Sequence, residues 1–352
     1  MNEKLPTPDL PTPNPVGLDG IDFLELAGPD PQMLRRLLLD FGFARTQRHA
    51  TKRIDLYEQN AIKILVNDEP GSVAKAFAAV HGPTVSGMGW RVADEARAVE
   101  IATQRGATRA TQTDLDLPAV LGIGGTLLYL TEGALRGFEP HPAPDSGANH
   151  GFLAIDHLTN NVACGTMQSW ASFYKDVFGF TEVRYFDIRG KKTGLTSYAL
   201  RSPCGKFSIP INEASDKKSQ INEYLDEHKG PGVQHVAFLT TDILSSLAAM
   251  DGTRVRFLDI EPGYYEEAFS RVPQVTEDRA QVRVRNVLVD GDEAGYLLQI
   301  FTKNLMGPLF IELIQRKNHL SFGEGNFGAL FRSIERDQAR RGVFRDEVAT
   351  GQ

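Results

Sequence analysis

Cysteine is almost absent from this sequence. Cys164 and Cys204 are the only two in a chain of 352 residues, which is too few for a disulfide framework or for a metal site built from thiolates. Structural disulfides belong to oxidising compartments, so their exclusion favours a reducing one. We therefore expect a cytoplasmic protein.

Long apolar runs and an excess of positive charge are also lacking. No stretch approaches the roughly 20 apolar residues that a membrane-spanning helix requires. The formal net charge of -7 leaves no surplus of lysine and arginine to displace counterions from a nucleic-acid backbone. Neither a membrane nor a nucleic acid is expected as a partner, and a small molecule fits better.

The sequence does contain enough apolar material for two domains. Its length is about twice that of a typical single domain, and its hydrophobic content of 41 % is that of a globular protein with a sizeable core. The first segment, MNEKLPTPDLPTPNP, alternates proline with polar residues and lacks the apolar centre of a secretory signal. We expect residues 1–16 to form a disordered arm.

An internal repeat organises the chain. Residues 21–43 are predicted to form a strand and then a helix that Asp30 caps and Pro31 begins. Residues 155–180 repeat this plan, and both segments open with Ile-Asp and close with Phe-Gly-Phe. The expected apolar stripes are Leu34, Leu37, Leu38 and Phe41 in the first helix, before Gly42, and Trp170, Phe173, Tyr174 and Val177 in the second, before Gly179.

A second, weaker similarity completes the plan. Residues 87–94 and 232–242 each read as a short strand leading towards a helix. Four strand-helix-strand units in two pairs are the simplest organisation, and they predict the α+β class. The linker chemistry of HPAPDSGANHG places the junction near residues 140–150. We expect an N-terminal domain over 17–145 and a C-terminal domain over 150–352.

Three candidate metal ligands lie in the C-terminal half. In the two repeats His157 stands where the first half has Phe23, and His235 stands where it has Trp90. His157 and His235 are 78 residues apart, and His235 and Glu312 are 77 apart. Each candidate is thus about one structural unit from the next, and only the C-terminal half is expected to carry the chemistry.

The candidates also share an apolar setting. An ionised carboxylate such as Glu312 in a core strand must be neutralised, paired or bound to a metal. Two imidazoles and one carboxylate form the facial triad that suits Fe(II) and leaves positions open for substrate and dioxygen. In the alternative, each histidine is a hydrogen-bonded core residue and Glu312 pairs with Arg316. Strand alternation predicts two same-face sets, which are Val233, His235, Ala237 and Leu239, and Phe310, Glu312 and Ile314.

An ordered series of segments runs through residues 151–335. They are AIDHLTNNV, FYKDVFGF, GLTSYAL, SPCGKFSIPINE, KSQINEYL, GPGVQHVAF, GYLLQIFTK, PLFIELIQR and FGEGNFGALFRSIE. In this order they resemble the 4-hydroxyphenylpyruvate dioxygenase family. The resemblance implies two vicinal-oxygen-chelate domains of paired βαβββ modules and a C-terminal helix. It assigns Fe(II) to the same three residues, and the N-terminal half resembles the family only in general plan.

The resemblance also implies an activity. Members convert 4-hydroxyphenylpyruvate and dioxygen to homogentisate and carbon dioxide in tyrosine and phenylalanine catabolism, and they form homo-oligomers, either dimers or tetramers. Catalytic roles fall to Gln234, Gln299 and Phe327. Substrate contacts fall to Ser197, Pro210, Asn212, Gln220, Phe301, Phe310, Phe322 and Asn326.

Each of these assignments has a simpler alternative. The polar residues could be ordinary turn or strand residues, and Pro210 could mark a strand edge. At helical spacing, Phe327 belongs to an apolar stripe that is more often core packing than a ligand wall. The charged residues of that helix would then be a solvated face. The stripe consists of Phe327, Leu330, Phe331 and Ile334, and the charged set of Arg332, Glu335, Arg336, Asp337, Arg340 and Arg341.

Three other functions remain open, two of them enzymatic and one a binding function. A 4-hydroxymandelate synthase shares fold, metal and substrate but oxidises the side-chain carbon, and Pro210 and Phe327 resemble the ring-hydroxylating type instead. The others are an extradiol ring-cleaving dioxygenase and a metal-free binding protein on the same scaffold. The sequence also departs from some family members, which have a longer glycine-rich insertion where only residues 317–321 separate Arg316 from Phe322. This departure leaves the gating role of the final helix open.

Overall fold

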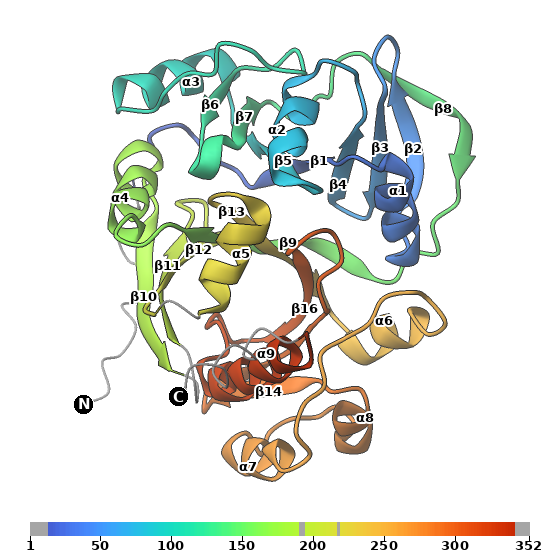
Figure 1. Ribbon diagram of the computed structural model, residues 1–352, viewed down its shortest axis with the longest axis vertical. Helices are drawn as coiled ribbons and strands as arrows, with labels where there is room; N and C mark the ends of the chain where they lie inside the picture. Colours follow the sequence, from blue (N-terminus) through green and yellow to red (C-terminus); the bar gives the residue numbers. More distant parts are fainter. Residues whose placement is uncertain (1–12, 190–193, 217–218, 342–352) are drawn as a thin grey trace, which may run out of the picture.

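The computed structural model describes residues 13–189, 194–216 and 219–341, which form two eight-stranded sheets with helices. The N-terminal half lies in the upper part of Figure 1 and the C-terminal half in the lower part. Most of the expected disordered arm, residues 1–12, lies outside the described residues. The first described residues are anchored, because the Asn14 side chain hydrogen-bonds the backbone of Leu18 and Val16 is buried.

The N-terminal half consists of two βαβββ modules joined by a helix. The first module comprises β1 (Ile21–Ala27), α1 (Pro31–Asp40), β2 (Ala44–His49), β3 (Ile54–Gln59) and β4 (Ile62–Asn67). After α2 (Val73–His81), the second comprises β5 (Thr84–Arg91), α3 (Glu95–Gln104), β6 (Ala119–Leu121), β7 (Leu127–Thr131) and β8 (Phe138–Asp145). The sheet order is β6-β7-β5-β1-β4-β3-β2-β8, so the last strand crosses to the far edge.

The C-terminal half repeats the plan with additional helices. Its third module comprises β9 (Phe152–Val162), α4 (Met167–Phe178), β10 (Thr181–Arg189), β11 (Gly194–Arg201) and β12 (Ser208–Ala214). After α5 (Gln220–His228), the fourth comprises β13 (Gly232–Thr240), α6 (Ile243–Ala249), α7 (Tyr264–Arg271), α8 (Arg279–Val284), β14 (Leu288–Asp292), β15 (Gly295–Phe301) and β16 (Phe310–Lys317). The sheet order is β10-β11-β12-β9-β13-β16-β15-β14.

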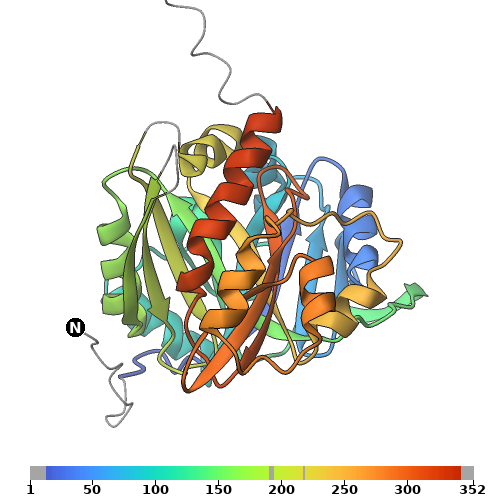
Figure 2. The same cartoon turned by 90° about the horizontal axis from the view of Figure 1, so that it is seen from below.

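A final helix closes the curled C-terminal sheet. The short helix η2 (Glu324–Asn326) leads into α9 (Phe327–Arg341). Figure 2 shows α9 lying between the β10 and β14 ends of the sheet. The predicted α+β fold of paired βαβββ modules with a C-terminal helix is confirmed.

The helix cap and the helix-ending glycines lie where the sequence predicts them. Asp30 caps α1 by accepting hydrogen bonds from two backbone amides of its first turn. Gly42, just after this helix, has a φ of 81°, and Gly179, the C-cap of α4, has a φ of 79°. Both glycines adopt the left-handed conformation that ends helices, because they have no Cβ to oppose it.

The expected linker is partly wrong. Residues 138–145 are not a linker but strand β8, which pairs with β2 at the edge of the N-terminal sheet. Its prolines occupy every second position, at 140, 142 and 144, and alternate prolines are compatible with an edge strand because half of its N–H groups need no partner strand. Asp145 pairs with Arg35 at 2.7 Å and with Arg45 at 3.1 Å. The connection between the halves is therefore confined to the segment after Asp145.

The charged residues of α9 do not form a simple solvated face. Arg332 and Arg336 pair with Glu261 in the loop before α7, and Glu335 is only 7 % exposed. The prediction of a solvated face is therefore wrong for Glu335. Arg332 and Arg336 stay partly exposed, in ion pairs that hold α9 to the fourth module. In the described part of the chain, no helix combines the length and apolar content needed to span a bilayer.

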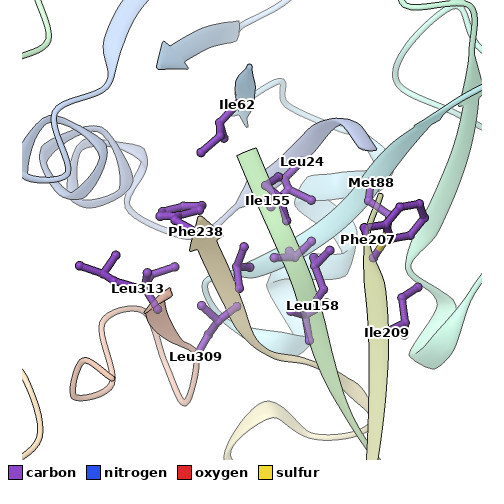
Figure 3. Close-up of a cluster of buried hydrophobic side chains, with 14 of the residues drawn as sticks. Leu24, Ile62, Met88, Ile155, Leu158, Phe207, Ile209, Phe238, Leu309 and Leu313 are labelled. Carbon is purple, nitrogen blue, oxygen red and sulfur yellow. The ribbon is translucent and has the colours of Figure 1, made fainter. Parts of the chain in front are cut away.

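One hydrophobic core joins the two halves. Leu24 of β1 belongs to the same buried cluster as Ile155 of β9 and Phe238 of β13 (Figure 3). The rings of Phe41 and Phe238 lie 6.0 Å apart in an edge-on arrangement. The N-terminal half thus provides a packed support for the strands β9 and β13, and packed side chains leave little freedom for those strands to shift.

Candidate metal centre

Three adjacent strands bring His157, His235 and Glu312 together. Strand β13 lies between β9 and β16, and its residue Ala237 is the register partner of His157 on one side and of Glu312 on the other. Nε2 of His157 lies 3.1 Å from Oε2 of Glu312 and 3.4 Å from Nε2 of His235. Nε2 of His235 lies 3.4 Å from the same carboxylate oxygen.

This geometry suits a single metal ion. Two ligands at right angles on an octahedral ion, with bonds of about 2.1 Å, lie about 3.0 Å apart. The three separations, between 3.1 and 3.4 Å, match three ligands on one face of such an ion. All three side chains are buried. The residues present therefore fit a divalent cation of the kind that two imidazoles and one carboxylate hold.

A β-bulge aims two consecutive side chains of β13 at the site. Val233 pairs with Asn160, whereas His235 pairs with Thr159, so the register shifts at Gln234. Both Gln234 and His235 line the cavity, while Val233 does not. The prediction that Val233 shares a face with His235 is wrong, because strict alternation fails across a bulge. Bulges of this kind are common beside active sites, where they redirect a side chain.

A carboxylate behind the site orients one of the candidate ligands. Nδ1 of His157 donates a hydrogen bond of 2.7 Å to Asp156. Asp156 accepts two further hydrogen bonds of 2.8 Å from Arg316, which also donates to two carbonyls of the loop after β16. Arg316 therefore pairs with Asp156 and not with Glu312, which removes the alternative partner considered for Glu312.

The shared carboxylate affects the two histidines differently. Burial alone would lower the pKa of His157, but the charges and hydrogen bonds of Glu312 and Asp156 outweigh burial and raise it to about 9. Burial lowers the pKa of His235, because Glu312 compensates it only in part. His157 holds the pKa of Glu312 below its ordinary value despite burial. Without a cation, His157 and Glu312 form an ion pair, and a bound cation would replace that proton.

A cavity opens beside the three candidate ligands and collects nearly all of the expected contact residues. Asn326 is the exception, since it is fully buried behind the cavity and donates a hydrogen bond to Gln299. Phe310 stacks on His235 at 4.8 Å, and Phe322 meets His157 edge-on at 5.6 Å. The expected residues that line the cavity are Ser197, Pro210, Asn212, Gln220, Gln234, Gln299, Phe301, Phe310, Phe322 and Phe327.

Sequence reasoning missed several other lining residues. Alternation along β11 from Ser197 gives Leu195 and Ala199, and Phe186 is the register partner of Ser197. Leu195 and Ala199 could have been found from the strand period once Ser197 was chosen, whereas Phe186 required the pairing of β10 with β11. The lining residues without an assigned role are Thr159, Phe186, Leu195, Ala199, Leu330, Phe331 and Ile334.

A second group of potential ligands lies near η2. Within the described ranges, Asp290, His319 and Glu324 also have ligand atoms within 4.8 Å of one another. Asp290 faces Arg271 at 3.5 Å, and Glu324 pairs with Arg184 at 2.5 Å. Because both carboxylates already face an arginine, this group is a poorer cation site than the triad.

The fold and the triad together define the class of protein. Paired βαβββ modules that bring two histidines and one carboxylate together in the C-terminal half are the arrangement of the vicinal-oxygen-chelate class. Residues 12–135 match the family described as "Hydroxyphenylpyruvate dioxygenase, HPPD, N-terminal". Residues 154–286 match the "Glyoxalase/Bleomycin resistance protein/Dioxygenase superfamily".

Similar proteins narrow this class to one family. The chain is 54 % identical to "Protein MelA" of Shewanella colwelliana and 46 % identical to "4-hydroxyphenylpyruvate dioxygenase" of Pseudomonas sp., each match covering 94 % of this chain and 98 % of the relative. A mutant of 4-hydroxymandelate synthase from Streptomyces coelicolor has a similar structure, with a TM-score of 0.78 and 27 % identity over 93 % of this chain and 100 % of that chain. The chain belongs to the 4-hydroxyphenylpyruvate dioxygenase family of non-haem iron(II)-dependent dioxygenases.

Proposed function

We propose that this protein is a 4-hydroxyphenylpyruvate dioxygenase that forms homogentisate and carbon dioxide. The observation that carries the proposal is that the triad lies in the wall of a cavity that phenylalanine and amide side chains also line. His157, His235 and Glu312 would hold Fe(II). A bound Fe(II) would accept the two oxygens of the substrate's 2-oxo acid as ligands and would supply the activation of dioxygen. One oxygen atom enters the new carboxylate and the other enters the ring, so the atoms of both substrates are accounted for.

The protein's own residues would orient the substrate. Ser197 and Asn212 are register partners on β11 and β12, and Asn212 lies four residues beyond Ser208, the partner of His157. At about 3.3 Å per residue, this polar pair is about 13 Å further along the strand than the metal ligands. A substrate with an oxo acid at one end and a phenol at the other fits between the two ends of the cavity.

The apolar walls would keep water from the reacting atoms. The rings of Phe310 and Phe322 cover the two histidines, and Phe327 contacts Phe186 edge-on at 5.0 Å. A dry cavity favours reaction within the bound substrate over side reactions with water. The apolar walls thus favour an oxidation in which the bound substrate, and not water, is the reaction partner.

The principal rival is 4-hydroxymandelate synthase, because its structure is also similar to this chain. Pro210 and Phe327 both line the cavity and resemble the ring-hydroxylating type, which favours homogentisate. A homo-oligomeric state and a cytoplasmic location are further predictions from the sequence.

An oxygen-uptake assay with product identification tests the proposal. The anaerobically prepared protein is loaded with ferrous iron and mixed with 4-hydroxyphenylpyruvate, and the products are separated by chromatography. We expect one homogentisate and one carbon dioxide per dioxygen consumed, and no uptake with zinc in place of iron. Hydroxymandelate as the main product would favour the synthase. Uptake with a catechol but not with 4-hydroxyphenylpyruvate would favour a ring-cleaving enzyme.

A further inference from the structure

The fourth module contains a segment that the other three modules lack. In the described chain, a single helix follows the first strand of each of the other modules, whereas α6, α7 and α8 all follow β13. Helix α7 begins at Tyr264, which is 7 % exposed and lies close to η2, the short helix before α9. The added segment thus reaches the element that closes the cavity.

The Tyr264 hydroxyl joins β14 to that closing element. The backbone amide of Val289 donates to this hydroxyl at 2.7 Å. Two acceptors face its single proton: Oδ1 of Asn326 at 2.5 Å and the carbonyl of Val289 at 2.9 Å. The shorter distance favours donation to Asn326. Tyr264 is therefore fixed by the sheet and in turn holds the Asn326 side chain.

Asn326 in turn orients the side chain of Gln299. With its Oδ1 facing Tyr264, Asn326 turns its Nδ2 towards Gln299 and donates to Oε1 at 3.3 Å. The same Oε1 lies against Gly323, where a Cβ would come within 1.9 Å of it. Within the described residues nothing accepts a hydrogen bond from Nε2 of Gln299, and Gln299 lines the cavity. The amide oxygen is thus occupied by η2, and the NH₂ group is left for a ligand.

We propose that Tyr264 is a positioning residue that, through Asn326, fixes the amide of Gln299 with its NH₂ group towards the substrate. A donor held in one orientation can select an oxygen substituent of the substrate without losing side-chain freedom when the substrate binds. The identity of that substrate rests on the proposed function. The chain of hydrogen bonds does not, and it can be tested separately.

Tyr265, the next residue, provides a matched control. Its hydroxyl is buried and has no hydrogen-bond partner in the described part of the chain. Tyr264→Phe and Tyr265→Phe therefore remove the same atom from adjacent positions on α7, but only the first breaks the connection to Asn326. Amide hydrogen exchange over residues 320–330, measured by mass spectrometry, should increase in Tyr264→Phe and stay unchanged in Tyr265→Phe.

Kinetics distinguish positioning from a purely structural role. Tyr264→Phe should lower kcat/KM by about tenfold, the effect of one lost hydrogen bond that orients the substrate, mainly through a higher KM. It should also increase the dioxygen consumed per homogentisate formed. Tyr265→Phe should leave both unchanged. A Tyr264→Phe protein that melts at a lower temperature but keeps KM and the product ratio would show a structural role only and overturn the proposal.

A double-mutant cycle tests the route through Asn326. Asn326→Ala should reproduce the defects of Tyr264→Phe, and the double variant should be no worse than Asn326→Ala alone. If the loss of kcat/KM in the double variant equalled the product of the two single losses, the two residues would act independently and the proposal would be overturned. If the wild-type protein failed to turn over 4-hydroxyphenylpyruvate, the proposed function would fail. The exchange comparison between Tyr264→Phe and Tyr265→Phe would still decide whether the hydrogen-bond chain holds η2.

Discussion

Asp156 accepts a hydrogen bond from Nδ1 of His157 at 2.7 Å and thereby decides which nitrogen of that imidazole faces the cavity. With Nδ1 occupied, Nε2 points towards Glu312 and His235, where a bound cation would replace its proton. Arg316 in turn holds Asp156 with two hydrogen bonds of 2.8 Å. Carboxylates in this position fix the tautomer of a metal-binding histidine and increase its basicity.

Asp156→Asn should therefore weaken metal binding by about 10- to 100-fold. The substitution keeps the shape of the side chain but removes the charge that faces His157 and Arg316. Competition between the protein and a chelator for zinc measures the affinity without requiring turnover. The matched control is Asp22→Asn, because Asp22 is also ion-paired, at a more buried position, but precedes Phe23 in the other half. Equal metal loss in both variants would contradict an orienting role for Asp156.

Glu312→Ala should abolish both metal binding and oxygen uptake while the protein stays folded. Removing a ligand of the triad should lower the affinity by more than the roughly 100-fold limit for an outer partner, and metal content and uptake report it directly. The control is Glu25→Gln, which alters a fully buried carboxylate that accepts a hydrogen bond from Asn67 in the N-terminal half. If iron-dependent oxygen uptake survived in Glu312→Ala, or vanished in Glu25→Gln, the metal centre would be assigned to the wrong residues.

The contact between the halves should weaken in acid. His228 of α5 stacks on His81 of α2 at 4.5 Å and hydrogen-bonds Thr84 and Gly230. Burial lowers the pKa of His228 from 6.5 to about 4, so the unfolded chain binds this proton more readily than the folded one. This contribution to the free energy of unfolding is fully present above pH ~6.5 and is lost as the pH falls towards ~4, by at most about 3 kcal/mol.

Two variants isolate this effect in denaturant titrations between pH 4 and 8. His228→Gln should lessen the loss of stability towards acid pH in that window. His81→Phe keeps a ring in the stack and should retain most of it, because burial contributes more than His81 to the lowered pKa. An unchanged slope in His228→Gln would assign the acid sensitivity to other groups.

The parts of the fold that local chemistry decides could be predicted from the sequence. The cap at Asp30, the stop at Gly179 and the repeat itself are local patterns. The candidate ligands were found because the repeat exposed His157 and His235 as departures from their aromatic counterparts. Three strands of matching register then place them with Glu312 within 3.4 Å.

The missed features depend on residues that are distant in sequence. Strand β8 pairs with β2 about a hundred residues away, so its proline-rich sequence resembled a linker. The bulge at Gln234 exists only relative to β9. Arg316 meets Asp156 across 160 residues, and Asn326 is hidden because η2 folds back on Gln299. None of these contacts leaves a periodic signal in the sequence.

Product choice should depend on Phe327, the first residue of α9. Its ring lines the cavity and meets Phe186 edge-on at 5.0 Å. Ring hydroxylation requires the aromatic carbon to lie closer to the reacting oxygen than the benzylic carbon does, and a displacement of about 1 Å can change such a competition by about 100-fold. Phe327→Ile keeps the metal ligands and opens space beside the substrate ring, so that the ring can tilt.

Phe327→Ile should therefore still consume dioxygen and release carbon dioxide, because in the proposed reaction decarboxylation would precede the choice of carbon. Part of its product should shift from homogentisate to hydroxymandelate or to uncoupled hydroxyphenylacetate, which chromatography separates. Phe173→Ile on α4, a ring outside the cavity that packs on Tyr174 and Phe178, should yield only homogentisate. If Phe327→Ile also yielded only homogentisate at near wild-type rate, the Phe327 ring would be core packing, and the preference for ring hydroxylation would have to come from other residues of the wall.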